Sequence, residues 1–289
     1  MAARVIGIIG GSGLYQIDGM EGAEWRPVAS PWGTPSDALL VGAIGGVPAV
    51  FLPRHGRGHV QSPTTIDYRA NIDALKRCGV TDVISVSAVG SFREDLAPGD
   101  FVLVDQFIDR TVNREKSFFG AGLVAHVAFG EPTCPRLRGH LAEAAAALGI
   151  TAHAGGTYLA MEGPQFSTRA ESVLYRGWGC SVIGMTNMPE AKLAREAEMC
   201  YATVAMVTDY DSWHPAHDVV DIPAILATMH ANSDKARRLI AAVVPRLGGD
   251  FDCPHGCNRA LDTAVMTAPD RRDPALAARL DAVAGRVLA

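Results

Sequence analysis

Short runs of apolar residues alternate along the chain with longer segments whose apolar residues recur at helical spacing. The runs predict buried strands at 5–9, 48–52, 82–87, 101–104, 155–161, 181–183 and 201–207. The periodic segments predict helices at 62–79, 135–148, 168–177 and 221–244, with another beginning at Asn187. Strands that are apolar on both sides belong in sheets covered on both faces. The pattern therefore predicts one α/β domain around a central, largely buried sheet.

Cap and break residues define several of these boundaries. Thr168-x-x-Glu171 is a capping-box pattern, and Asn187 and Asp221 are expected to cap the helices that follow them. The composition changes at 248–252, and Asp273-Pro274 then opens a short amphipathic helix. We expect a main domain over 1–248 and a C-terminal extension over 249–289. That extension is expected to pack on the body or on a neighbouring subunit.

Composition narrows the class of protein. The 289 residues are 48% hydrophobic, enough for one large core. The net charge is -5 without a long run of like charge, which argues against nucleic acid as a partner. The N-terminal segment lacks the regions of a signal peptide, and no apolar stretch is long enough to cross a bilayer. We expect a cytoplasmic protein that does not bind membranes.

Six cysteines occur, and we interpret four of them as reduced, buried thiols: Cys78, Cys134, Cys180 and Cys200. The segment Cys253-Pro-His-Gly-Cys257 also holds His255 and so offers three potential metal ligands. Because its spacing differs from the common zinc motifs, a reversible disulfide or plain thiols is the favoured interpretation. We expect no metal.

Two segments that follow predicted strands could bind an anion. Gly10-Gly11-Ser12-Gly13 offers backbone N–H groups and a hydroxyl, or is simply a turn. It lacks the third glycine of a dinucleotide-binding fingerprint, which disfavours a Rossmann oxidoreductase. Arg54-His55-Gly56-Arg57-x-His59 supplies cationic groups suited to oxyanions; the alternative is a solvated loop.

Small polar residues at other element ends could join them. Ser87-Ala88-Val89-Gly90-Ser91 ends a predicted strand in small residues, so its N–H groups could meet a ligand or merely form a turn. Thr186 stands at a helix N-terminus, where the dipole favours an anion, or it acts only as a cap.

Two carboxylates directly follow the strand that ends at Val207. Asp209 and Asp211 are two residues apart and face the same way in extended backbone. A carboxyl group buried there can have a raised pKa and donate a proton. Metal ligation is an alternative, although no further ligand lies at matching spacing, and a solvated turn is another. Catalysis is the favoured interpretation.

Together these segments resemble the trimeric purine nucleoside phosphorylase and methylthioadenosine phosphorylase family over residues 4–247, with the methylthioadenosine enzymes the closer match. The resemblance rests on 8–14, Arg54-His55-Gly56-Arg57, Ile108-Asp109-Arg110-Thr111, 162–167 and Met188-Pro189-Glu190. It implies one α/β domain whose central mixed, partly barrel-like sheet is flanked by helices. It also implies a homotrimer or hexamer with inorganic phosphate as co-substrate and no cofactor.

The same resemblance assigns roles to individual residues. Phosphate would be bound by Ser12, Arg54, His55, Ser87, the Ala88 N–H and Thr186. The catalytic carboxylates would be Asp209 and Asp211. The nucleoside would contact Phe166, Ser167 and Met185, and its methylthio group would contact Ile222, Ile225, Leu226 and His126 of a neighbouring subunit.

Three positions separate this chain from the related phosphorylases of 6-oxopurines. Those enzymes have Glu where Ser167 stands, Asn where Asp209 stands, and His near Ile222. A carboxylate accepts a hydrogen bond from a 6-amino group and repels a carbonyl. An aliphatic wall suits a thioether and leaves a 5'-hydroxyl unpaired. We therefore expect phosphorolysis of 5'-methylthioadenosine. The alternatives are a methylthioinosine or general purine nucleoside phosphorylase, and a non-catalytic nucleoside sensor.

Overall fold

The computed structural model describes residues 3–11, 14, 17, 19–214, 222–250 and 252–288, except the side chains at 222 and 224. Its strands are β1 (Ile6–Gly10), β2 (Glu21–Arg26), β3 (Leu39–Ile44), β4 (Val47–Pro53), β5 (Asp82–Ser91), β6 (Phe101–Leu103), β7 (Gln106–Asp109), β8 (Ala152–Ala154), β9 (Thr157–Ala160), β10 (Val182–Gly184) and β11 (Cys200–Tyr210). Its α-helices are α1 (Tyr68–Arg77), α2 (Pro135–Ala147), α3 (Arg169–Gly177), α4 (Asn187–Glu196), α5 (Ile222–Val243), α6 (Pro274–Arg279) and α7 (Asp281–Leu288). Short 3₁₀ turns cover Val244–Leu247, Cys257–Arg259 and Pro269–Arg271.

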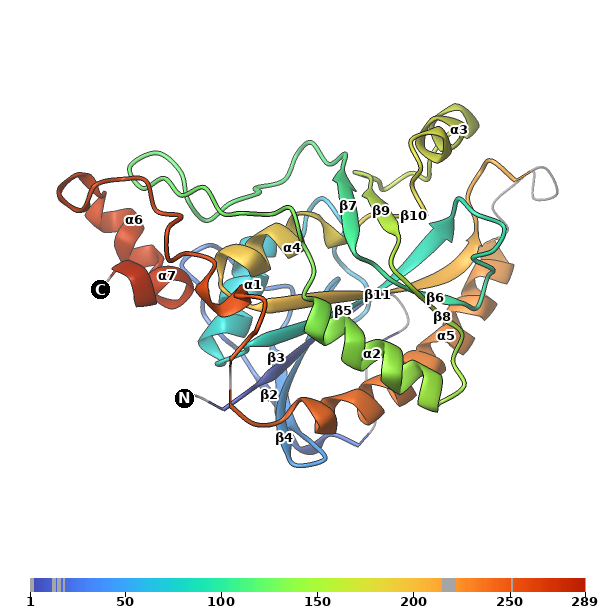
Figure 1. The fold of residues 1–289 in the computed structure, drawn as a ribbon, viewed down its shortest axis with the longest axis horizontal. Coiled ribbons are helices and arrows are strands. Elements are labelled where there is room, and N and C mark those ends of the chain that lie inside the picture. Colours follow the sequence, from blue (N-terminus) through green and yellow to red (C-terminus); the bar gives the residue numbers. More distant parts are fainter. Residues whose placement is uncertain are drawn as a thin grey trace.

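The described strands form one mixed sheet. Its main path runs β2-β3-β4-β1-β5-β10-β9-β7, while β11 pairs with both β5 and β6, and β6 with β8 (Figure 1). The pairs β4–β1, β1–β5 and β5–β11 are parallel, whereas β10 runs antiparallel to β5. The predicted α/β domain with a central mixed sheet is confirmed. Since parallel neighbours end at the same edge, the carboxyl ends of β4, β1, β5 and β11 lie together.

Helices cover both faces of this sheet (Figure 1). One core packs the sheet against α1, α4 and α7, and a second packs it against α2 and α5. Along β11, Tyr201, Ala205 and Val207 enter the first core, while Val204 and Met206 enter the second. This alternation explains why the strand is apolar throughout.

Two predicted boundaries are wrong. Helix α1 begins at Tyr68 rather than near Ser62, because the Asp67 side chain accepts from the Ala70 N–H and caps the helix there. Strand β5 continues through Ser87–Gly90 to Ser91, because β11 keeps pairing with it as far as Tyr210. The alternative of a turn at these small residues is therefore wrong.

Several strands escaped sequence analysis. Strand β2 (sequence EGAEWR) is mostly solvent-exposed and has no apolar run, and β7 is half-buried along its length. Strand β3 is buried only at its two ends. Such edge segments take their conformation from neighbouring strands more than from their own composition.

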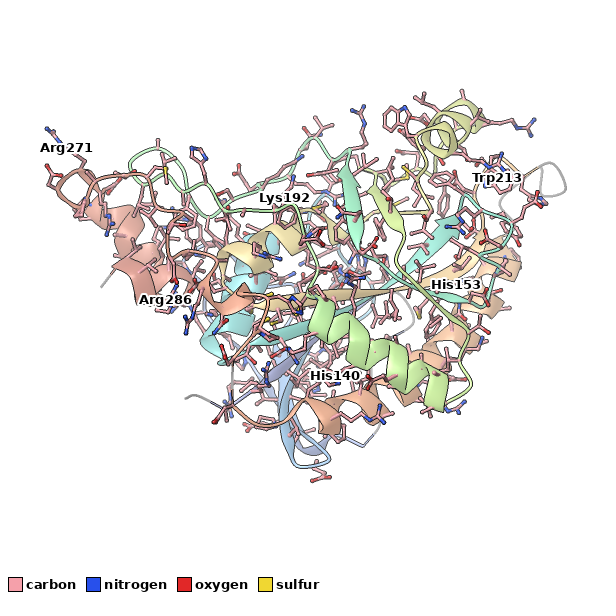
Figure 2. The ribbon with its side chains drawn as sticks, in the orientation of Figure 1. His140, His153, Lys192, Trp213, Arg271 and Arg286 are labelled. Carbon is pink, nitrogen blue, oxygen red and sulfur yellow. The ribbon has the colours of Figure 1, made fainter. Side chains whose placement is uncertain are left out.

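The C-terminal extension packs on the body of its own chain. Two helices, α6 and α7, replace the single predicted one, with Leu280 between them, and Asp273 caps α6 as expected. Arg77 of α1 pairs with Asp281. Arg286, labelled in Figure 2, donates to the buried Glu198 at 2.6 and 2.8 Å. Among the described helices, none combines the length and apolar character that a membrane span needs.

Candidate active site

A cavity of about 470 Å³ opens at the carboxyl ends of β4, β1, β5 and β11. Loops after these strands supply one part of its wall, and α5 supplies Ile225 and Met229. The predicted site residues that line it are Arg54, His55, Ser87, Ala88, Phe166, Met185, Thr186, Asp209, Asp211 and Ile225. Arg54 and Asp209, which the proposed chemistry needs together, therefore share one cavity.

The remaining predicted residues have different positions. Ser12 lies outside the described residues, as do the Asp221 cap and the side chain of Ile222. Ser167 and Leu226 are not part of the cavity lining. His126 is exposed in a loop beside the extension, where its N–H donates to the Ala264 carbonyl, and does not line the cavity of its own chain.

One end of the cavity gathers hydroxyl groups around a guanidinium. Ser87 Oγ lies 3.2 Å from Thr186 Oγ1 and 3.3 Å from the Tyr158 hydroxyl. Gly11 completes this wall, because a Cβ there would come within 2.8 Å of the Val86 carbonyl and 2.9 Å of Arg54 Nη1. Backbone N–H groups, hydroxyls and a cation in one concave place are suited to a small oxyanion.

Arg54 has fewer N–H groups available for a ligand than its sequence context implied. Its side chain is 1% exposed and pairs with Glu190 at 2.8 Å. It also donates to the Val86 carbonyl and to Ser85 Oγ, so these bonds with described residues leave one Nη1 proton for a ligand. Although burial opposes the charge, the Glu190 carboxylate raises the pKa of Arg54. The guanidinium therefore stays charged, and its bonds to Glu190, Val86 and Ser85 fix its orientation.

His55 is held in a neutral form. Burial, and then the charge of Arg54, lower its pKa to about 4. Its Nδ1 lies 2.9 Å from the Gln61 carbonyl, which can only accept, so Nδ1 carries the proton and Nε2 offers a lone pair. Its ring stacks on His59 with centroids 4.2 Å apart. A neutral His55 can accept a hydrogen bond from a protonated oxyanion.

The expectation that Asn187 caps α4 is wrong. Thr186 is the N-cap residue, although its side chain makes no capping bond and its Oγ1 contacts Ser87 instead. The Asn187 amide is fully buried, and its Nδ2, which has two protons to donate, lies within hydrogen-bond distance of three core hydroxyls: Ser85, Tyr201 and Thr203. Tertiary hydrogen bonds thus replace the local cap, and the Thr186 hydroxyl faces the cavity.

The opposite end of the cavity carries the two aspartates. A bulge between Val207 and Asp209 interrupts the pairing of β11 with β5, and both Asp209 and Asp211 line the cavity beyond it. Gly90 lies between them: a Cβ there would meet Asp211 Cβ at 3.3 Å and Asp209 Oδ2 at 3.4 Å. A side chain at position 90 would therefore crowd both carboxylates.

The aspartates differ in their surroundings. Burial raises the pKa of Asp209 to about 6; the Thr208 hydroxyl, which donates at 2.6 Å, opposes this, and the Asp211 charge adds to it. Asp211 accepts from Ser167 Oγ at 2.6 Å. Ser167 therefore positions a carboxylate rather than lining the cavity itself. A carboxyl group with a pKa near neutrality is suited to general acid catalysis.

Apolar side chains close the cavity between its two polar ends. Phe166 is 54% exposed at the mouth, and Met185 packs beneath Gly163. Val60 and Met229 also line the cavity and were not predicted. Met229 could have been found, because it follows Ile225 by four residues and so shares its helix face. His59, from the predicted Arg54–His59 segment, also lines the cavity, whereas the 60–63 segment carries no comparable signal.

The chain is similar in sequence to known proteins. The model of the phosphorylase superfamily matches residues 5–245, and the chain belongs to this family. The S-methyl-5'-thioadenosine phosphorylase of Cereibacter sphaeroides is 70% identical over 285 residues, covering 98% of each chain. The enzyme of that name from Bradyrhizobium diazoefficiens is 62% identical, covering 100% of this chain and 99% of its own.

Solved structures agree with this placement. A methylthioadenosine phosphorylase from an antarctic soil metagenomic library is 43% identical with a TM-score of 0.90, covering 97% of this chain and 98% of that one. The Schistosoma mansoni methylthioadenosine phosphorylase in complex with tubercidin is 36% identical with a TM-score of 0.82, covering 89% and 97%.

Burial of Asp209 should cost stability at neutral pH. A carboxyl pKa raised by folding gives stability that is present below the unfolded value of 3.8 and is lost as pH rises through about 6. We therefore expect Asp209→Asn to raise the free energy of unfolding by about 1–3 kcal/mol at pH 8. At pH 4 the substitution should have little effect.

Urea unfolding at the two pH values measures this difference. Asp37→Asn is the matched control, because hydrogen bonding from Arg57 lowers the pKa of Asp37, so this substitution should destabilise at pH 8. Equal stability of Asp209→Asn and the parent chain at pH 8 would contradict the raised pKa.

Proposed function

We propose that this chain uses inorganic phosphate to convert 5'-methylthioadenosine into adenine and 5-methylthioribose 1-phosphate. The observation that carries the proposal is one cavity with an oxyanion end at Arg54, Ser87 and Thr186 and a raised-pKa carboxyl group at Asp209. The names of relatives that span nearly the whole chain support it. Phosphate is a co-substrate, and the step requires no organic cofactor.

Phosphate would lie at the hydroxyl end, beneath C1' of the ribose. Ser87, Thr186, the Ala88 N–H and the remaining Arg54 proton would donate to it, together with Ser12. His55 Nε2 would accept from its protonated oxygen. As the C1'–N9 bond stretches, the sugar gains positive charge that the phosphate stabilises. A phosphate oxygen then bonds to C1' as N9 leaves with the bonding electrons.

The aspartates would act on the base. Asp209 would deliver a proton to N7, which makes adenine a better leaving group. Asp211, held by Ser167, would accept from the 6-amino group and orient the ring. A carboxylate cannot donate to a 6-oxo group, and this favours adenine over hypoxanthine.

Aliphatic residues would recognise the 5' substituent. Ile225 lines the cavity, and Ile222 and Leu226 would extend this wall toward the methylthio group, with Met185 against the ribose. A methylthioinosine or general purine nucleoside phosphorylase is the second candidate, since both would use the same phosphate end. We favour methylthioadenosine because the described residues that α5 supplies to this wall, Ile225 and Met229, are both apolar. They would leave a 5'-hydroxyl without a hydrogen-bond partner.

We also infer that the chain works as a cytoplasmic homotrimer, in which His126 of one subunit reaches the cavity of the next. The position of His126, exposed and away from its own cavity, supports this arrangement. Light scattering should give three times the chain mass, and His126→Ala should raise the KM for methylthioadenosine with the mass unchanged. A monomer with full activity would contradict the inference.

Phosphate-dependent release of adenine is the direct test of the function. With methylthioadenosine, removal of phosphate should abolish release, and adenosine should react with a kcat/KM about 10–100-fold lower, because its 5'-hydroxyl would be left unpaired. Methylthioinosine, tested in parallel, should be a poorer substrate than methylthioadenosine. Faster turnover of either competing nucleoside would favour the second candidate.

Asp209→Asn tests the proton donor. We expect kcat for methylthioadenosine to fall about 10²–10⁴-fold, since the amide cannot deliver the proton. Preference should shift toward 6-oxo bases, because Asn can donate to the carbonyl. In the parent enzyme kcat/KM should fall as pH rises above about 6, where Asp209 loses its proton. Unchanged kinetics on both classes of base would refute this role.

A further inference from the structure

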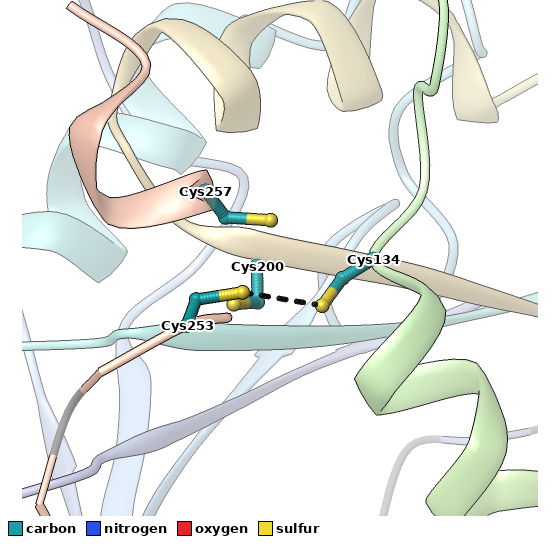
Figure 3. A group of neighbouring side chains, drawn as sticks. All are labelled: Cys134, Cys200, Cys253 and Cys257. Carbon is teal, nitrogen blue, oxygen red and sulfur yellow. Dashed lines mark hydrogen bonds between the residues drawn. The ribbon is translucent and has the colours of Figure 1, made fainter. Parts of the chain in front are cut away.

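Four cysteines from distant parts of the chain converge on one buried point. Cys134 precedes α2, Cys200 begins β11, and Cys253 and Cys257 belong to the C-terminal extension. Their sulfur atoms all lie within 4.8 Å of one another, and all four residues are buried (Figure 3). Cys134 and Cys200 are free and buried, as expected, and the fold brings them to the Cys253–Cys257 pair.

The sulfur separations match a tetrahedral metal centre. Cys134 Sγ lies 3.7 Å from Cys253 Sγ. A zinc ion with Zn–S bonds of about 2.3 Å places its thiolates about 3.8 Å apart at the corners of a tetrahedron. A disulfide needs its sulfurs about 2.05 Å apart, far closer than this pair. An iron–sulfur cluster interposes its own atoms and so needs a wider cage.

We propose that Cys134, Cys200, Cys253 and Cys257 form a structural site for one zinc ion. The set has the composition of a closed structural centre, with four thiolates and no position for substrate. The two cysteines of the extension are separated by three residues, within the range of zinc-binding pairs, so the expectation that their spacing differs from zinc motifs is wrong. The proposal departs from the sequence-based expectation of a disulfide or plain thiols and of no metal.

The surroundings suit a centre of net negative charge. Cys134 is the N-cap residue of α2, where the helix dipole stabilises a thiolate. The Nε of Arg136, the second residue of this helix, is buried and has no hydrogen-bond partner among the described residues. A guanidinium in the first turn of the helix that Cys134 caps favours a thiolate over a thiol.

An ion-pair network lies beside Cys200, which pairs with Asp82 across the strands β11 and β5. Asp82, at the amino end of β5, forms ion pairs with Arg4 and Arg136. Arg4 also donates to the Asp252 carbonyl, which directly precedes Cys253. The Asp82 carboxylate thus holds two arginines next to the thiolates. It is not an isolated negative charge that would repel the thiolates.

The position assigns the ion a structural role. Cys200 begins β11 and Asp209 lies near its end, so the two sites are about 30 Å apart along the strand. The ion would join the extension to α2 and β11, at the edge of the sheet opposite the substrate cavity. Failure of the proposed phosphorolysis would therefore leave this site untouched, and its metal content is measured without any activity assay.

Metal analysis of the untagged full chain is the test. Protein produced in zinc-supplemented medium and passed through a desalting column should hold about one zinc per chain by plasma mass spectrometry. Cys253→Ser and Cys257→Ser should each lower this ratio at least about tenfold. Cys180→Ser, which removes a buried cysteine outside the cluster, is the matched control and should keep the zinc.

A second measurement on the parent chain covers the case in which the serine variants do not fold. Titration with an organomercurial should release zinc, seen with a chromogenic chelator, as the cluster thiols react. Absence of metal with all six thiols titratable in denaturant would overturn the proposal in favour of plain thiols. Absence of metal with fewer thiols would overturn it in favour of disulfides, and stoichiometric iron would overturn the assignment to zinc.

Discussion

The buried ion pair between Arg54 and Glu190 is the interaction on which the oxyanion end of the cavity depends. It joins the loop after β4 to α4 and, through Ser85 and Val86, to the central strand β5. Two charges in the core are costly to desolvate, so the pair stabilises the fold only while both partners are present. Its main effect is to fix one N–H group of a rigid cation at the cavity wall, beside the Ser87 and Thr186 hydroxyls.

Asp209, the proposed proton donor, depends on the opposite arrangement, because its charge is left largely uncompensated. Asp209 receives a hydrogen bond from Thr208 but has no cation among its described interactions, and burial raises its pKa. Arg54 keeps its charge because Glu190 faces it; Asp209 holds its proton up to about pH 6 because burial raises its pKa. One cavity thereby holds a permanent cation and a carboxyl group with a raised pKa, as transfer of a sugar from a purine base to phosphate requires.

Most of this cavity could be predicted from the sequence, because its residues lie at or directly after the ends of apolar strands. Parallel strands end at a common edge of the sheet. It could not find contacts that arise only in three dimensions. The partner of Arg54 is 136 positions away, and Asn187 serves the core rather than its own helix. The cysteine cluster was missed for the same reason, since 119 positions separate Cys134 from Cys253. Edge strands such as β2 lacked a hydrophobic signal altogether.

The long pairing of β5 with β11 has a consequence for the cost of catalysis. These strands match from Asp82 and Cys200 to Ser91 and Tyr210, buried on both faces for most of that length. The backbone that carries the two aspartates is therefore immobilised when the chain folds, long before a nucleoside arrives. Little conformational entropy remains to be lost from these groups on encounter, so binding energy can go toward the reacting bond.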